Sequence, residues 1–280
     1  MTTESRPLLG AKPSPLMLRI LSAFVILAIV IGAIYAGTYG AYALAILLGG
    51  LALWEFGSLS DGMGSRAPSW LLFPLGAFFA FSGTVLKQVD VNLVLALTLV
   101  GGLAAFLFVP GRRQGLGRWA MGVAGALYIG MPLNYYLLLR TSQPHGLVWA
   151  LFTIFAVVAN DSLALLVGSR IGRHPFFPMI SPRKTVEGAI AGVVGSVIVM
   201  LVGVSAIIGL APLHAIALGI LVGVSAQLGD LVESQMKRIA EVKDSSSLIP
   251  GHGGVLDRLD SILFPPILVY FYVTMFHILQ

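Results

Sequence analysis

The sequence predicts an all-α, polytopic integral membrane protein with about nine transmembrane helices and a cytoplasmic N-terminus. The 280 residues are 57% hydrophobic and only 10% charged, whereas soluble domains carry about 25% charged residues. Apolar runs long enough to cross a bilayer recur along the whole chain. Lipid offers the backbone no hydrogen-bond partners, so we expect these runs to be helices.

The chain begins with a polar segment, residues 1–15, which we expect to form a short cytoplasmic tail. The first apolar run is too long for a signal-peptide core and lacks a small-residue cleavage site, so we interpret it as a span. Because proline lacks a backbone N–H, Pro132 in the fifth run and Pro265-Pro266 in the ninth should kink or start helices. The nine expected spans cover residues 18–36, 39–56, 70–86, 91–109, 119–139, 147–168, 188–210, 213–234 and 262–279.

The positive charges predict the orientation of the chain. With the N-terminus in the cytoplasm, only Lys87 and Arg140 of the 17 Lys and Arg residues fall on the opposite side, which also holds the C-terminus. Membrane proteins keep such a positive bias on their cytoplasmic side. Topology therefore explains the net charge of +5 better than nucleic-acid binding does. The chain has no cysteine, which excludes disulfides, a thiolate nucleophile and cysteine metal ligands.

The densest polar segment of the chain runs from Ser234 to Asp260, between the last two expected spans. Its carboxylates could hold a hard divalent cation, and its lysines and arginines could hold phosphates. Gly253 and Gly254 would let backbone N–H groups approach an anion closely. The plain alternative is an ordinary basic loop between two membrane helices. The segment contains nine ionisable side chains: Lys237, Arg238, Glu241, Lys243, Asp244, His252, Asp257, Arg258 and Asp260.

Helical periodicity predicts how the polar residues at the end of the eighth run are arranged. If that helix continues beyond the membrane, Asp230, Ser234 and Lys237 share one face. By the same count we expect Glu233 to lie elsewhere, as a plain surface residue. The helix would thus carry a carboxylate, a hydroxyl and an ammonium group from the membrane edge into the cytoplasm.

Two further carboxylates, Asp257 and Asp260, are three residues apart and would share a face if their segment is helical. Asp230 and Asp257 come from different segments and form the natural metal-binding pair, since carboxylate oxygens suit a hard divalent ion. Asp260 is a further candidate ligand or a partner of the basic residues.

A second polar region begins at Asp161, within the sixth apolar run. A carboxylate there costs at least about 2.5–3.5 kcal/mol on insertion scales, so it should face a polar cavity or a partner. Pairing with an arginine for packing alone is the alternative. The loop that follows leads through Arg183 and Lys184 into the seventh run, with Thr185 and Glu187 near a helix N-terminus. A helix N-terminus favours anions, so a phosphate could be held there together with the two cations.

The residues of these two regions resemble the signature of the phosphatidate cytidylyltransferase (CDP-diacylglycerol synthase) family. The resemblance covers roughly residues 20–280 and is strongest over 160–260. The family continues its Asn-Asp pair with a small residue and an aromatic, whereas this chain has Ser162, Leu163 and Leu165, which leaves the packing around the pair open. The matching positions are Asn160, Asp161, 181–188, Ser234, Lys237, Arg238, Lys243, Asp244, Pro250, His252, Gly253, Gly254, Asp257, Arg258 and Asp260.

This resemblance implies a transferase of phospholipid biosynthesis that moves CMP from CTP to phosphatidate and gives CDP-diacylglycerol and pyrophosphate. It also implies Mg²⁺ as cofactor, a homodimer, and an active site at the cytoplasmic face of a bacterial inner membrane. We accordingly divide the chain into a tail at 1–15, N-terminal transmembrane helices at 16–146 and a C-terminal transmembrane catalytic region at 147–280. Phosphatidate already carries an anionic phosphate, so the reaction requires alignment and charge neutralisation rather than a protein nucleophile.

The matching positions, together with Asp230, are assigned roles on this basis. The catalytic candidates are Lys237, Arg238, Lys243, Asp244, His252 and Arg258. The substrate-binding candidates are Asp161, Ser181, Arg183, Lys184, Thr185, Glu187, Ser234, Gly253 and Gly254. The candidate Mg²⁺ ligands are Asp230, Asp257 and Asp260.

Two other functions stay open on the sequence. One is CTP-dependent transfer to another lipid, as in a polyprenol kinase, because the acceptor lipid is not encoded in a recognisable motif. The other is an ion-coupled transporter, since acidic residues in membrane helices also suit ion coupling. Transporters place such residues near the middle of the membrane, whereas the polar residues here gather on one face.

Overall fold

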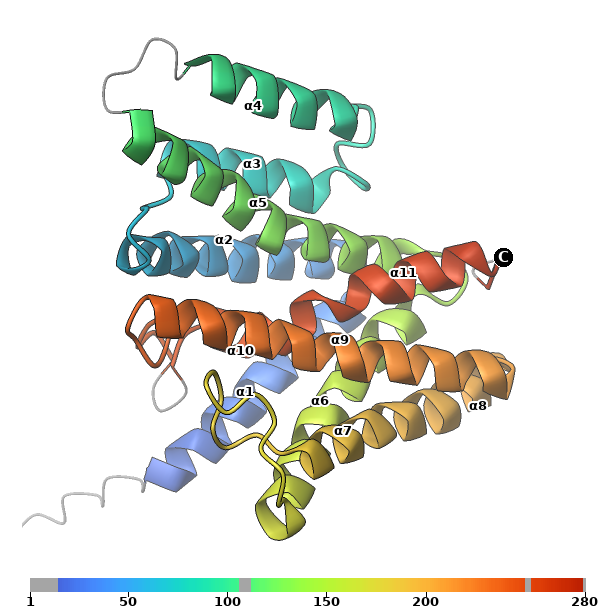
Figure 1. Cartoon of the computed structure of the whole chain (residues 1–280). Coiled ribbons are helices and arrows are strands. Elements are labelled where there is room, and N and C mark those ends of the chain that lie inside the picture. The colour runs from blue at the N-terminus through green and yellow to red at the C-terminus, as the bar shows by residue number, and fades with distance from the viewer. Residues whose placement is uncertain (1–14, 106–111, 250–252, 279–280) are drawn as a thin grey trace, which may run out of the picture.

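The computed structural model describes residues 15–105, 112–249 and 253–278, and the regular secondary structure of these residues is entirely helical (Figure 1). This confirms the predicted all-α class. The helices are α1 (Pro15–Tyr35), α2 (Thr38–Gly62), α3 (Ser69–Phe81), α4 (Val91–Ala105), α5 (Arg112–Thr141), α6 (Gly146–Ile171), α7 (Val186–Val199), the π-helical turn η1 (Met200–Val204), α8 (Ser205–Ile208), α9 (Pro212–Ile239), α10 (Leu256–Leu263) and α11 (Pro265–Met275).

Several of these helices are long and apolar enough to cross a membrane. Within the described residues, five segments meet that criterion by length and composition: Thr38–Gly62, Gln114–Thr141, Gly146–Ile171, Val186–Ile208 and Pro212–Ile239. Three shorter apolar helices coincide with other expected spans: Phe24–Tyr35, Ser69–Phe81 and Val91–Ala105. The chain is therefore a membrane protein with several spans, and the count of nine stays a prediction.

The ninth expected span, 262–279, begins at the end of α10 and corresponds mainly to α11. Helix α10 ends at Leu263, and α11 starts with Pro265 and Pro266 in its first turn. Proline suits that position because the N–H groups of a first helical turn have no partner within the helix. The prediction that these prolines start a helix is confirmed. Pro132, in contrast, lies inside α5, which continues on both sides of it.

The connections between helices separate into two groups, one at each end of the molecule. In Figure 1 the α2–α3 connection, the α6–α7 loop and the loop after α9 lie toward the left end. The α3–α4 and α8–α9 connections and the end of α11 lie toward the right end. The three described connections that were predicted to be cytoplasmic therefore share one end. Which end faces the cytoplasm stays a prediction of the charge distribution.

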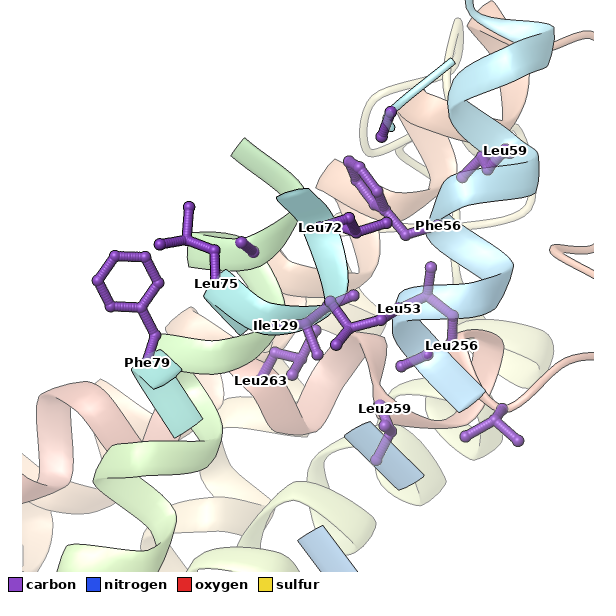
Figure 2. Close-up of a cluster of buried hydrophobic side chains, with 14 of the residues drawn as sticks. Leu53, Phe56, Leu59, Leu72, Leu75, Phe79, Ile129, Leu256, Leu259 and Leu263 are labelled. Atoms are coloured by element: carbon purple, nitrogen blue, oxygen red, sulfur yellow. The ribbon is translucent and has the colours of Figure 1, made fainter. Parts of the chain in front are cut away.

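A buried apolar cluster joins α10 to the helices of the N-terminal half (Figure 2). Even a small gap between buried side chains loses dispersion contacts. The close packing of this cluster therefore fixes the positions of the helices that contribute side chains to it. Helix α10 carries Asp257 and Asp260, and it is thus placed by α2, α3 and α5. The labelled members are Leu53, Phe56, Leu59, Leu72, Leu75, Phe79, Ile129, Leu256, Leu259 and Leu263.

Helix α10 also packs closely against α9. A Cβ atom at Gly229 of α9 would overlap the carbonyl oxygen of Asp260, so only glycine fits at this contact. Small residues permit such close approach between membrane helices. The contact brings the polar residues at the end of α9 next to those of α10.

Candidate functional site

A cavity of about 660 Å³ lies between α6, α7, α9, α10 and the loop before α7. It is the polar cavity that the carboxylate in the sixth apolar run was expected to face. Both signs of charge line it, which suits a ligand that combines phosphates with a cation. Its polar lining consists of Asn160, Asp161, Ser169, Arg183, Lys184, Thr185, Gln227, Asp230, Lys237, Asp244, Asp257, Arg258, Asp260 and Ser261.

The structure brings ten of the predicted site residues to this one cavity: Asp161, Arg183, Lys184, Thr185, Asp230, Lys237, Asp244, Asp257, Arg258 and Asp260. Another seven are described but do not line it: Ser181, Glu187, Ser234, Arg238, Lys243, Gly253 and Gly254. His252 falls outside the described residues. The chemical roles predicted for these residues stay predictions.

Asp161 is held at the cavity by its neighbour in α6. Asn160 is buried and donates from Nδ2 to Asp161 Oδ1 at 3.0 Å. The amide oxygen of Asn160 accepts from Gln227 Nε2 of α9 at 3.0 Å, and Gln227 also donates to the Ala189 carbonyl of α7 at 2.8 Å. This network joins three helices around one carboxylate. Gln227 was not among the predicted residues.

The loop between α6 and α7 is closed by its own backbone. Phe176 N donates to the Lys184 carbonyl at 2.8 Å, and Val186 N donates to the His174 carbonyl at 2.9 Å. Thr185 is the N-cap of α7, and its hydroxyl accepts from Gly188 N at 3.2 Å. The predicted helix N-terminus is therefore present beside the cavity.

Two charged residues of this region have different surroundings. Lys184 lines the cavity, and its Nζ lies 2.5 Å from Asp230 Oδ2 of α9. Glu187 instead accepts from the backbone N–H groups of Arg173 and His174 at 3.1 and 3.3 Å, and lies 2.6 Å from His174 Nδ1. Glu187 thus holds the start of the loop against α7, outside the cavity lining.

Two observations agree with the predicted face of α9. Ser234 Oγ donates to Asp230 Oδ1 at 3.2 Å, and Lys237 lines the same cavity as Asp230. The expectation for Glu233 was wrong, because this residue is fully buried and its Oε2 lies 3.3 Å from Lys237 Nζ. Residues three apart on an α-helix differ in direction by only about 60°, so Glu233 is turned toward the same packed region.

Asp257 is the most extensively bound carboxylate of the cavity. Its Oδ1 lies 2.5 Å from Lys237 Nζ. Its Oδ2 accepts from Ser245 N at 2.9 Å, from Gly254 N at 2.8 Å and from the Ser245 hydroxyl at 2.9 Å. Asp257 belongs to α10, which lies outside the five candidate membrane spans. Although burial raises the pKa of Asp257, the hydrogen bonds from Lys237 and these backbone groups hold that pKa below its usual value.

Three further predicted residues lie outside the cavity lining. Arg238 Nε donates to the Ile180 carbonyl at 3.3 Å and so joins α9 to the α6–α7 loop. Ser181 N donates to the Phe177 carbonyl at 3.0 Å. Gly253 has a φ of +81°, a left-handed conformation that favours glycine.

One buried acid, Glu55 of α2, was missed in the sequence although it contacts the segment that carries Asp257. The available signal was a charged residue inside an expected membrane span, which is costly unless it has partners. Those partners lie about 200 residues further along the chain, so periodicity could not identify them.

The donor set at the cavity suits Mg²⁺ bound together with a substrate. Among the described residues no three His, Asp or Glu side chains gather as a metal cluster. Mg²⁺ is commonly held by one or two carboxylates, with substrate phosphates and water completing its shell. Asp230 and Asp257 both line the cavity and offer hard oxygen ligands. These residues therefore fit that ion.

Comparisons with known proteins identify the family to which this chain is similar. A model of the cytidylyltransferase family matches residues 17–276. The chain is 38% identical over 154 residues to a phosphatidate cytidylyltransferase of Bacillus subtilis, covering 54% of this chain and 56% of that protein. It is 31% identical over 204 residues to one of Mycobacterium bovis, covering 72% of this chain and 66% of the relative. The chain thus spans less than two thirds of the length of either relative.

Proposed function

The chain belongs to the cytidylyltransferase family, and on that premise we propose that it transfers CMP from CTP to phosphatidate, giving CDP-diacylglycerol and pyrophosphate. The observation that carries this proposal is the gathering of four cations and five carboxylates around one cavity at the end of apolar helices. A soluble nucleotide and a lipid phosphate can meet at such a place. The cations suit the phosphates of both substrates.

The reaction needs no covalent intermediate with the protein. An oxygen of the phosphatidate phosphate attacks the α-phosphorus of CTP and forms the new P–O bond. The bond from that phosphorus to the bridging oxygen breaks, and pyrophosphate leaves with the electron pair. Arg183, Lys184, Lys237 and Arg258 would hold the two phosphate groups in line and neutralise the charge that develops on the leaving group.

Asp230 and Asp257 are the residues that would hold Mg²⁺, with Asp260 beside them. When bound, this ion supplies positive charge to the triphosphate of CTP. Lys184 and Lys237, which contact these two carboxylates, would then turn toward phosphate oxygens. Asp161 and Asp244 lie at the same cavity and would orient the basic residues or the substrates.

We extend the proposal to the setting of the reaction. The bias of Lys and Arg toward one set of loops supports a cytoplasmic active site and a cytoplasmic N-terminus. We place the protein in a bacterial inner membrane and as a homodimer, as its resemblance to the family implies.

The test uses CTP labelled at either its α- or its γ-phosphate, with the purified full-length protein, phosphatidate and Mg²⁺ in detergent. We expect the α-label to appear in a lipid and the γ-label in pyrophosphate, and we expect removal of Mg²⁺ by EDTA to stop both. A γ-label that moves to a lipid alcohol would identify a kinase and contradict the proposal. Transfer of neither label to lipid or pyrophosphate would also contradict it.

A further inference from the structure

Glu55 of α2 is completely buried and has four hydrogen-bond contacts with a distant part of the chain. Its Oε1 accepts from Ser246 Oγ at 2.7 Å and from Val255 N at 2.9 Å. Its Oε2 accepts from Leu256 N at 2.6 Å and lies 2.9 Å from Ser245 Oγ, whose single proton is shared with Asp257. We call these four contacts the Glu55 clamp. A buried carboxylate is strongly unfavourable unless it is bound in this way.

The Glu55 clamp acts on both flanks of the segment between α9 and α10. Ser245 and Ser246 follow α9, whereas Val255 and Leu256 begin α10. The first N–H groups of a helix have no partner within the helix, and a carboxylate is favourable there. Glu55 therefore caps α10 from a different helix and fixes the turn immediately before Asp257.

Ser245 connects the clamp to Asp257. Its hydroxyl lies 2.9 Å from Glu55 Oε2 and 2.9 Å from Asp257 Oδ2, while its backbone N–H donates to the same Asp257 oxygen. Gly254 leaves the space that this arrangement requires, because a Cβ atom there would overlap both the Ser245 hydroxyl and Glu55 Oε2. One serine thus contacts both carboxylates.

Asp257 lines the cavity, but Glu55, Ser245 and Ser246 do not. Glu55 consequently acts on the site only through the segment that it binds. We propose that Glu55 is a positioning residue for the CMP transfer described above, which holds the Asp257 carboxylate in its place at the cavity. The expected effect on catalysis rests on the proposed function, whereas the contacts of the Glu55 clamp do not depend on it.

The informative variant is Glu55→Gln. Each oxygen of Glu55 accepts one backbone N–H, from Val255 or from Leu256. The NH₂ group of glutamine must therefore face one of these donors, and a backbone N–H, unlike a hydroxyl, cannot rotate away. Asp61→Asn is the matched control, because it makes the same acid-to-amide change on the same helix at a side chain that is 61% exposed.

The first readout is turnover of CTP and phosphatidate by the full-length protein. We expect Glu55→Gln to lower kcat by about 100-fold, the effect of a misplacement of about 1 Å, with KM for phosphatidate little changed. Glu55→Asp keeps both acceptor oxygens on a shorter stem and should recover part of the loss. Asp61→Asn should stay within about twofold of wild type. A wild-type kcat in Glu55→Gln would overturn the proposal.

The second readout needs no substrate. The chain has no cysteine, so Ser247→Cys, at an exposed position of the clamped segment, can carry a single spin label. We expect the label to become more mobile when Glu55→Gln is added, and to be unaffected by Asp61→Asn. Unchanged mobility would overturn the clamp. A wild type that makes no CDP-diacylglycerol would instead overturn the proposed function, while the spin label still tests the clamp.

A second pair of variants applies if Glu55→Gln is not recovered as folded protein. Ser245→Ala removes the hydroxyl between the two carboxylates, whereas Ser246→Ala removes a hydroxyl that contacts Glu55 but not Asp257. The loss of kcat should be clearly larger for Ser245→Ala. Equal losses would overturn the connection from Glu55 to Asp257.

Discussion

At the scale of single residues, the cavity combines two kinds of predicted site residue in direct contact. Lys184 lies 2.5 Å from Asp230, and Lys237 lies 2.5 Å from Asp257. In each pair, a cation expected to hold phosphate contacts a carboxylate expected to hold Mg²⁺. Asp230 and Asp257 come from separate helices. A shared ion would therefore couple two residues that are not coupled by closeness in the sequence.

Asp230→Asn and Asp257→Asn test that coupling. Asparagine has the shape of aspartate without its charge, and Mg²⁺ requires hard, anionic oxygen ligands. We expect each single change nearly to abolish kcat/KM, and the double change to cost little more than the worse single one, because groups that act as a unit are strongly non-additive. Activity is measured over a Mg²⁺ series, with thermal stability as the control for folding.

Losses that multiply in the double variant, with an unchanged Mg²⁺ dependence, would contradict a shared ion. Asp244 or Asp260, which line the same cavity, would then be the better ligand candidates.

Periodicity and charge predicted much of this site, but only within single helices. The helical repeat placed Asp230 and Lys237 together, and the cost of an acid in lipid placed Asp161 at a cavity. The error at Glu233 arose from treating a residue 60° away from a face as outside it. Glu55 could not be assigned a role, because its partners are about 200 residues away and only the folded chain brings them near.

At the scale of helices, the contact between α9 and α10 determines how the two acidic elements meet. Gly229 allows the α9 backbone to approach the carbonyl of Asp260. Hydropathy could not predict this contact, because α9 was expected as an apolar run, whereas most of α10 lies in the polar segment before the ninth expected span. Helix α10 ends before Pro265 and is a short helix whose position depends on its neighbours.

Gly229→Ala should therefore separate α10 from α9. Overpacking of this kind costs about 1–3 kcal/mol, so we expect a lower melting temperature in detergent and reduced CMP transfer. Gly50→Ala is the matched control, since a Cβ atom at Gly50 of α2 would meet no atom within 4 Å, and alanine favours a helix over glycine. Gly229→Ala protein with wild-type stability and activity would show that the contact is not required.

At the scale of the whole molecule, composition was sufficient for the fold class but not for the number of spans. Apolar content predicted membrane helices, and five described segments have the necessary length. Helix α3 has 13 residues, or about 20 Å at 1.5 Å per residue, against a hydrocarbon core of about 30 Å. Apolar composition continues beyond such a helix end, so hydropathy alone overestimates helix length.

Single cysteines test the predicted sides of the membrane. Ser247→Cys lies in the segment after α9, and Gln88→Cys lies in the α3–α4 connection, and both positions are exposed. If the positive-inside assignment holds, a membrane-impermeant maleimide should label Ser247→Cys only from the cytoplasmic side and Gln88→Cys only from the outside. Labelling of both from one side would contradict the topology and the cytoplasmic active site.

The Glu55 clamp also constrains the order in which the protein is assembled during synthesis. Val255 and Leu256 follow Glu55 by 200 and 201 residues, so the ribosome completes α2 long before it makes the donors that satisfy its carboxylate. On insertion scales a carboxylate without partners costs about 2.5–3.5 kcal/mol at the centre of a membrane helix, and less at Glu55, which lies seven residues before the end of α2. The intervening helices are therefore inserted beside an acid that still lacks these donors, and the clamp closes only after α10 has begun to emerge.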